Sequence, residues 1–312
     1  MFKQSLKLFA GTCAIAACAT IAAPQAAEAF TWTYGMDSAY DGTGGGLNGQ
    51  AHGVGPQSKY EAFGMAYTAT NDTVTFAFNA NFGLAGHYSG GAADKNIGWG
   101  DFFLNLDPTQ SFSQAKASGN VLGIRFSENN DSLIGGTQTG VYTDITTTNV
   151  ASTNSGWSNY NKYSNYVNKK GGSVETIDGM SNAEAKDYLG LNSQTNGDNV
   201  LSGGTKVGDI SMLTSSDLDS MGLDFGSQGG TGTDTFGFSF ARSLLPGGDL
   251  RWMAHVMAEC TNDTVGMYGE FVAQTPPPGT PGNPDAATPE PFSMIGAGLA
   301  LGAGALLKNR KK

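Results

Sequence analysis

Residues 73–82 read Thr-Val-Thr-Phe-Ala-Phe-Asn-Ala-Asn-Phe, and this stretch decides the fold class. Apolar side chains stand at every second position, and the positions between them carry small or polar side chains. A period of two places one set on each face of a β-strand, so we expect one buried face. Asn71 and Asp72 precede this run and follow another apolar run at 60–68, which together predict a β-hairpin. The residues expected on the buried face are Val74, Phe76, Phe78, Ala80 and Phe82.

Similar short runs recur along the rest of the chain. Gly is abundant, with 46 residues, and Asn, Ser and Thr crowd the segments between the runs, which favours turns over long helices. The chain lacks the strand–helix–strand alternation that predicts a parallel sheet. We therefore expect a mainly β fold, an antiparallel β-sandwich of jelly-roll type, over residues 30–274. Further strands are predicted at 30–34, 99–106, 121–126, 140–145, 206–213, 235–240, 250–260 and 265–272.

Residues 149–204 depart from this pattern and predict a partly helical insertion on the β scaffold. Ser181, followed three residues later by Glu184, has the form of a capping box and predicts a helix over 181–189. A tyrosine-rich stretch before it has helical spacing, and we expect it to pack on the sheet. Its members are Tyr160, Tyr163, Tyr166 and Val167, and shorter helices are predicted at 109–118 and 215–221.

Residues 1–29 have the order of a secretory signal peptide. Lys3 and Lys7 precede a short apolar run, and Ala27-Glu28-Ala29 then offers a small-residue site for cleavage between Ala29 and Phe30. We therefore expect an N-terminal signal helix and export of the chain. The segment 15–18, Ile-Ala-Ala-Cys, also resembles a lipoprotein processing box, which leaves lipidation of Cys18 as an alternative.

The C-terminal residues 289–312 have the pattern of a second targeting segment. Pro289-Glu290-Pro291 precedes an apolar run over 292–307, and a basic cluster ends the chain. A helix over that run would span about 24 Å, less than the roughly 30 Å hydrocarbon core, which predicts a transient transmembrane helix. The proline-rich residues 275–288 predict an extended linker before it. The basic cluster, which would stop transfer at the cytoplasmic face, consists of Lys308, Arg310, Lys311 and Lys312.

This three-part tail resembles the PEP-CTERM sorting signal of Gram-negative bacteria and cyanobacteria. The resemblance implies that an exosortase recognises residues 289–291 and that the hydrophobic tail is lost. Two internal segments, 96–105 and 259–263, resemble cyanobacterial exosortase-dependent surface proteins, in which the second segment commonly has Gly where this chain has Thr261. The resemblance implies a location rather than an activity.

The chain between the two ends is strongly acidic. Six of the 17 basic residues and two of the 27 acidic residues lie in the predicted end segments, which leaves residues 30–288 with a net charge of about −14. Such a charge repels nucleic acid, so we expect no nucleic-acid partner. Only Cys260 among the cysteines lies in this part, which excludes an intramolecular disulfide there, and we expect its thiol to be buried.

No catalytic motif stands out between the two ends, so we expect no enzymatic activity and assign no catalytic residue. Gly44, Gly46 and Gly49 satisfy G-x-G-x-x-G, but the residues that follow them cannot begin a helix, which indicates a loop. His255 lies within a predicted core strand, and we interpret it as structural. A carboxylate pair for glycoside hydrolysis stays open as an alternative, because the fold rather than the sequence sets its spacing.

The sequence assigns no metal site and no cofactor, and a structural calcium ion is the alternative. Calcium binds six to eight oxygen ligands, and several acidic loops offer them. One group, Asp217, Asp219 and Asp224, resembles the start of an EF-hand loop but lacks its later ligands, so we interpret it as an acidic helix start. The looser candidates are Asp37 with Asp41, Asp94 with Asn96 and Asp101, and Asn262 with Asp263.

Together these patterns predict an exported cell-surface or extracellular-matrix protein without catalysis. Its expected partners are signal peptidase and an exosortase for processing, and the envelope membrane before processing. The alternative function is a carbohydrate-binding surface module, whose partner would be a surface polysaccharide. The stacking platform would then be Trp99, Trp157 or the group from Tyr160 to Tyr166.

Overall fold

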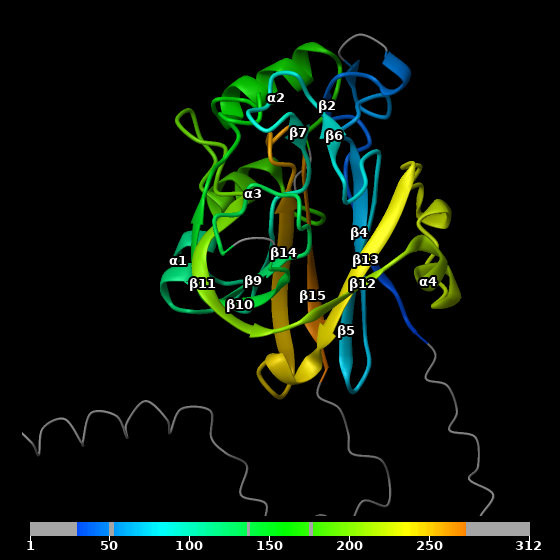
Figure 1. The fold of residues 1–312 in the computed structure, drawn as a ribbon, viewed down its shortest axis with the longest axis vertical. Helices are drawn as coiled ribbons and strands as arrows, with labels where there is room; N and C mark the ends of the chain where they lie inside the picture. The colour runs from blue at the N-terminus through cyan, green and yellow to red at the C-terminus, as the bar shows by residue number, and fades with distance from the viewer. Residues whose placement is uncertain (1–29, 50–52, 136–137, 175–176, 273–312) are drawn as a thin grey trace, which may run out of the picture. The chain divides into compact units, whose positions relative to one another are not determined.

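The computed structural model describes residues 30–49, 53–135, 138–174 and 177–272 (Figure 1). This part of the chain is mainly β, with antiparallel sheets and few helices, which is consistent with the predicted β-sandwich. The predicted signal peptide (1–29), linker (275–288) and sorting signal (289–312) lie outside the described residues. Within the ranges given, no helix has the length and apolar character needed to cross a bilayer.

The first sheet contains five strands in the order β1-β4-β5-β13-β12, and every neighbouring pair is antiparallel. Its centre is the predicted hairpin, now β4 and β5, in which Phe76 lies opposite Tyr67. On the other side of β5, the same Phe76 lies opposite Phe238. The strands are β1 (Thr33–Met36), β4 (Ala62–Ala69), β5 (Thr73–Ala80), β12 (Ile210–Leu213) and β13 (Asp234–Ala241).

The second sheet contains six antiparallel strands in the order β11-β10-β9-β8-β14-β15. Two short hairpins, β2 with β3 and β6 with β7, stand apart from both sheets. The strands of the second sheet are β8 (Phe102–Asn105), β9 (Val121–Arg125), β10 (Gly140–Thr148), β11 (Val200–Gly208), β14 (Leu250–Met257) and β15 (Thr264–Phe271). Those of the hairpins are β2 (Thr43–Gly44), β3 (Gly53–Val54), β6 (His87–Tyr88) and β7 (Asn96–Ile97).

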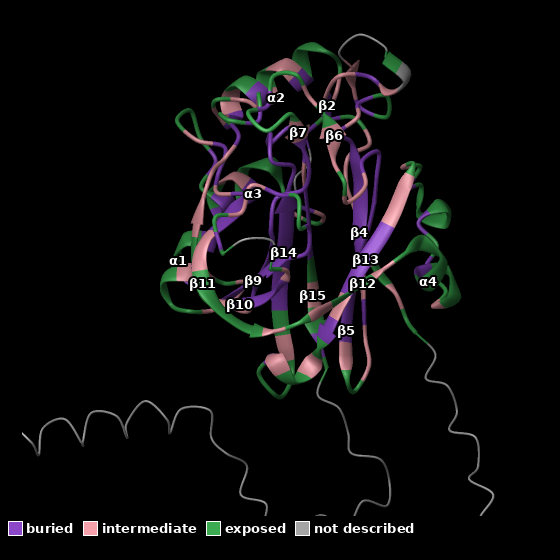
Figure 2. Cartoon of the chain, viewed as in Figure 1, coloured by how far each residue is buried: buried purple, intermediate pink, exposed green. Residues whose placement is uncertain are grey.

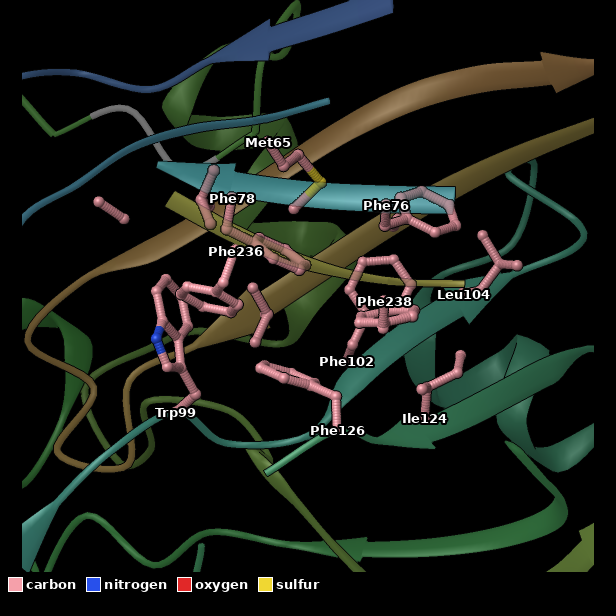
Figure 3. Packing of buried hydrophobic residues seen from close by; sticks show 14 of the residues in the cluster. Met65, Phe76, Phe78, Trp99, Phe102, Leu104, Ile124, Phe126, Phe236 and Phe238 are labelled. Atoms are coloured by element: carbon pink, nitrogen blue, oxygen red, sulfur yellow. The ribbon is translucent and has the colours of Figure 1, made fainter. Parts of the chain in front are cut away.

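The main hydrophobic core lies between the two sheets and is unusually aromatic (Figure 3). Phe76 and Phe78 of β5 contact Phe238 of the same sheet and Phe102 of the facing sheet. Each such buried side chain contributes roughly 1.5–3 kcal/mol through loss of apolar surface to water. The five residues predicted for the buried face of 73–82 all belong to this core. The alternation in that stretch therefore predicted this face correctly, but the expectation of a single buried face was wrong, because the opposite face of β5 is buried as well, with Ala77 in a separate core.

Helices cover the outer face of each sheet (Figures 1 and 2). Tyr160, Tyr163 and Val167 of α2 are buried in a second core with Met253 and Met257 of β14, which confirms that the tyrosine-rich stretch packs on the sheet. Ser181 and Glu184 form the predicted capping box of α3. The helices are α1 (Phe112–Ala117), α2 (Tyr160–Lys169), α3 (Asn182–Leu189) and α4 (Ser215–Ser220), with 3-10 turns η1 (Leu47–Gly49), η2 (Gly226–Gln228) and η3 (Arg242–Leu244).

Two predicted strands were wrong in their extent, and the one predicted at 30–34 is β1, over Thr33–Met36. The stretch 206–213 is divided at Asp209 between two strands, β11 of the second sheet and β12 of the first. Strand β11 also begins at Val200, so the end of the predicted insertion at 149–204 belongs to the sheet. Gly203 and Gly204 lie in β11 beside register irregularities in its pairing with β10, and they carry no side chain that reports an alternating pattern.

Candidate metal centre

Four carboxylates from three separate segments meet at one end of the two facing sheets. Asp37 directly follows β1, and Asp41 follows in the same loop. Glu61 directly precedes β4, and Asp263 directly precedes β15. One carboxylate oxygen from each of Asp37, Asp41 and Asp263 lies within 4.8 Å of the other two. Antiparallel strand ends therefore bring together acids that are far apart in the sequence.

The oxygen spacing suits a calcium ion. Calcium–oxygen distances are about 2.3–2.6 Å, so two oxygens bound to one ion lie at most about 5 Å apart. The three aspartates satisfy that limit. Magnesium requires distances of about 2.0–2.1 Å and near-octahedral geometry, and it retains several waters. A carboxylate cage of this size therefore fits calcium better than magnesium.

Glu61 extends the cluster from the side of β4. Its side chain is fully buried, with 0% exposure, and its Oε2 accepts a hydrogen bond from the Gly42 N–H at 2.9 Å. Its Oε1 is inaccessible and has no hydrogen-bond partner. A buried carboxylate oxygen without a partner is costly, because it has lost its hydration and received nothing in exchange. A cation at the cluster would satisfy it.

Asp37 and Asp263 complete the arrangement in different ways. Asp37 is half-buried as a residue, yet both of its carboxylate oxygens are inaccessible and have no hydrogen-bond partner. Asp263 is buried, and it accepts backbone hydrogen bonds from Ala62 and Thr264, each at 2.7 Å. The backbone thus fixes the direction of Asp263, while the oxygens of Asp37 stay available for a ligand.

The electrostatics of the metal-free cluster are unfavourable. Burial, reinforced by the charges of Asp41, Asp263 and Glu61, raises the pKa of Asp37 well above its ordinary value. Burial and the charge of Asp263 raise the pKa of Glu61 to about 10, and burial raises that of Asp263 to about 7. Like charges in a desolvated site disfavour simultaneous ionisation. A divalent cation removes this conflict because it neutralises the charges that the acids carry.

Gly42 permits the close approach of these acids. A Cβ atom at this position would lie 2.5 Å from Glu61 Oε2 and 2.9 Å from Asp263 Oδ2. It would also lie 2.6 Å from the Glu61 Cα, which belongs to the backbone and cannot swing away. Any side chain at 42 would therefore open the cluster.

The corner between β14 and β15 carries the segment 259–263 that supported the family resemblance. Glu259 is buried, and its carboxylate accepts the N–H groups of Gly98 at 2.7 Å and Asp131 at 2.5 Å. Its pKa is raised to about 8, chiefly by burial. Thr261 has a φ of 52°, a left-handed conformation that Gly adopts without strain.

The other predicted calcium groups do not join the cluster. Asp94 is exposed and accepts a hydrogen bond from the Asn96 N–H at 2.9 Å. Asp101 is buried, but it accepts hydrogen bonds from Asn130 Nδ2 at 2.8 Å and from the Leu201 N–H at 2.6 Å. The EF-hand-like group is a helix start, as interpreted, because Asp217 forms a capping box with Thr214 at the start of α4.

The predicted aromatic platforms separate into core and surface residues. Trp99 is 1% exposed and stacks on Phe82 inside the main core, so its assignment as a platform was wrong. Tyr160 and Tyr163 belong to α2 and are buried in the second core. Trp157 and Tyr166 are half-buried and line a cleft of about 560 Å³ beside the carboxylate cluster.

The remaining site predictions concern single residues. His255 is buried against Phe103, Phe112 and Tyr188, and burial lowers its pKa to about 3, which confirms a neutral core histidine. Cys260 is buried as expected. Phe30 is described and partly exposed. The other processing residues lie outside the described ranges: Cys18, Ala29, Pro289, Glu290, Pro291, Lys308, Arg310, Lys311 and Lys312.

Glu61 was not predicted as a site residue. The residue lies at the start of the apolar run 60–68, and a single acid in such a run is ordinarily interpreted as a strand residue that faces solvent. The available signal was its position between Tyr60 and Ala62, because a charge inside an apolar run is buried only with a partner.

Comparison of the chain with protein-family models, with curated proteins and with solved structures gave no match.

Proposed function

We propose that this chain is an exported surface protein, processed at both ends, whose β domain is stabilised by one calcium ion bound at Asp37, Asp41, Glu61 and Asp263. The observation that carries the proposal is the buried carboxylate cluster, in which Glu61 Oε1 and both oxygens of Asp37 have no hydrogen-bond partner. The described strand β15 ends at Phe271, shortly before the proline-rich linker. In this proposal the protein has no catalytic role, and its ends display or anchor the β domain outside the cell.

A calcium site is consistent with export of the chain. Extracellular calcium modules bind the ion with dissociation constants of about 10⁻⁴–10⁻³ M, weaker than intracellular sensors. A site of this strength is filled only where calcium is abundant. The acidic charge between the predicted ends also keeps a secreted domain soluble and attracts divalent cations.

The position of the acids argues against the hydrolase alternative. Glycosidase carboxylates flank a substrate-sized opening, at separations of about 5–10 Å. The residues that line the neighbouring cleft include Thr43, Tyr60 and Asn262 but none of the four acids. Acids that lie beneath a cleft wall are placed to hold an ion, and they do not face a substrate.

The jelly-roll connectivity stays part of this proposal. Within the described residues the chain passes between the facing sheets three times: from β5 to β8, from β11 to β12, and from β13 to β14. Each sheet is nevertheless built largely from hairpins of consecutive strands.

The processing half of the proposal is tested by intact mass in a host that carries an exosortase. Wild-type protein should appear outside the cell, with a mass that shows loss of residues 1–29 and of the hydrophobic tail. Replacing Pro289-Glu290-Pro291 by Ala-Ala-Ala should give a larger form that stays in the membrane. Equal mass and equal location of the two forms would exclude exosortase processing.

The calcium half is tested by thermal unfolding of the same protein in calcium, in magnesium and in EDTA. With 10 mM calcium and a dissociation constant of about 0.1–1 mM, mass action stabilises the fold by about 1.4–2.7 kcal/mol. For a domain of this size that raises Tm by roughly 3–11 °C. Equal Tm values in calcium and EDTA would contradict a bound ion, and an equal effect of magnesium would contradict its assignment as calcium.

A further inference from the structure

A cleft of about 560 Å³ lies beside the carboxylate cluster, within the range of about 300–1,000 Å³ typical of small-molecule sites. Its walls come from the β2 segment, the residues before β4, β6, the start and middle of the α2 region, and the β14–β15 corner. Three of these walls continue directly into the acids, because Thr43 follows Asp41 closely, Tyr60 adjoins Glu61 and Asn262 adjoins Asp263. The cleft and the metal centre therefore share their supporting segments.

Aromatic side chains form the apolar part of the cleft. The rings of Trp157 and Tyr166 have centroids 5.0 Å apart with an interplanar angle of 44°. The Trp157 indole N–H donates to Thr43 Oγ1 at 2.9 Å, which fixes the ring against the segment that also carries Asp41. Tyr88 lines the same cleft and is 76% exposed. A fixed aromatic surface that is open to solvent is suited to a ligand with one flat apolar face.

Polar groups surround these rings. Ser155 and Asn262 contribute a hydroxyl and an amide, and glycines 44, 45 and 156 also line the cleft. Lys59 is the single charged residue among those that line the cleft, although the chain as a whole is strongly acidic. Such a lining of ring faces, hydroxyls, amides and backbone groups matches a sugar ring, which has an apolar C–H face and an edge of hydroxyls. The low local charge allows both neutral and acidic sugars to approach.

We infer that the cleft binds a pyranose oligosaccharide, with a sugar ring placed on Trp157 and Tyr166, and that calcium at the four acids holds the cleft walls in their binding arrangement. The inference rests on the calcium site proposed above and adds a ligand to it. The Thr43 N–H donates to the Asn262 carbonyl at 3.0 Å, so the segments that carry Asp41 and Asp263 are joined at the cleft wall. An ion between these acids would therefore fix both walls together.

The test uses the full exported protein on an array of neutral and uronic acid oligosaccharides, in 5 mM calcium and in EDTA. Binding of the best oligosaccharide is then measured by calorimetry for Trp157→Ala, Tyr88→Ala and the control Tyr268→Ala, an exposed tyrosine of β15. Each cleft variant should lose about three- to tenfold in affinity, and the control should match wild type. Tyr88→Ala guards against a folding defect, because this side chain is largely exposed.

The outcomes separate the sugar site from the metal site. Affinity that falls in EDTA and in both cleft variants supports the inference. No binding in calcium, when a rise in Tm shows that the ion is bound, overturns the sugar site and leaves the calcium proposal standing. Equal affinity in EDTA and calcium overturns the coupling between ion and cleft. Binding that survives both cleft substitutions overturns the assignment of the site.

Discussion

Replacing Glu61 by Gln should stabilise the protein in EDTA and weaken its response to calcium. Gln keeps the size of Glu, and its amide oxygen can still accept the Gly42 N–H that Glu61 Oε2 accepts at 2.9 Å. The new amide N–H₂ would take the position of Oε1, which has no hydrogen-bond partner, and would donate to the acids of the cluster. The substitution thus replaces a carboxyl group that must be held protonated in the metal-free fold by a neutral amide, without removing the hydrogen bond from Gly42.

The magnitude follows from the raised pKa of Glu61. Its ordinary value is 4.5 and its value in the fold is about 10, so holding it protonated at pH 8 costs at most about 5 kcal/mol. Relaxation of the protein and penetration of water lower this upper limit. We therefore expect Glu61→Gln to raise the free energy of unfolding in EDTA by about 1–3 kcal/mol. Because the folded pKa lies above the unfolded one, the wild-type penalty is absent below pH 4.5 and grows as the pH rises towards 10. The difference between the two proteins must follow that direction.

The assay is thermal unfolding from pH 4 to pH 9, in EDTA and in 10 mM calcium. In EDTA at pH 8 the variant should melt roughly 2–12 °C above wild type, and the two should converge near pH 4. In calcium the difference in Tm should become smaller or change sign, because wild type keeps one more charged ligand for the ion. Glu270→Gln, the same change at an exposed residue of β15, is the matched control and should leave Tm unchanged. A less stable Glu61→Gln variant in EDTA at pH 8, or a difference that ignores pH, would refute the electrostatic argument.

Three further predictions concern the core and the β14–β15 corner. Phe78→Ala should cost about 3–5 kcal/mol in urea unfolding, because Phe78 is fully buried among the rings of Trp99, Phe126 and Phe236; a loss below 1 kcal/mol would contradict the packing of this core. Thr261→Gly should stabilise the fold by about 0.5–1 kcal/mol, because relief of the left-handed backbone, about 1–2 kcal/mol, exceeds the added chain entropy of Gly; lower stability of the variant in the same assay would disprove the strain. Cys260 should react with a thiol reagent only after unfolding, because the thiol is buried and burial raises its pKa; rapid labelling of the native protein at pH 8 would contradict its burial.

The β content of this chain was predictable because alternation is a local property. The alternating side chains of 73–82 and of the strand around Trp252 that were predicted to be buried lie in the main core. The opposite faces of these strands are also buried, with Ala77 and Met253 in separate cores, and alternation did not predict that. The capping box of Ser181 and Glu184 was equally local. The error at 206–213 arose where Gly203, Gly204 and Gly208 dilute the pattern near a crossing between sheets. Sheet membership depends on distant partners, which periodicity does not report.

The candidate metal centre was only partly predictable for the same reason. The sequence paired Asp37 with Asp41 and singled out Asp263, since each lies in an acidic loop, but no local pattern places the two loops together. A contact that joins the two segments, from the Thr43 N–H to the Asn262 carbonyl at 3.0 Å, links residues far apart in the sequence. Glu61 was missed because a lone acid in an apolar run gives no hint of three acids facing it. Its position between two apolar residues hints that it is buried with a partner, but only the folded chain shows which groups those partners are.

Calcium counting by isothermal titration tests the central claim most directly. The full exported protein should bind one calcium ion per chain, and Asp263→Asn should lose that binding because Asp263 is one of the three aspartates whose oxygens lie within 4.8 Å. Asp219→Asn, a matched change at an exposed aspartate of α4, should bind like wild type. Wild type that takes up no calcium, or an ion that Asp263→Asn still binds with unchanged affinity, would contradict the account.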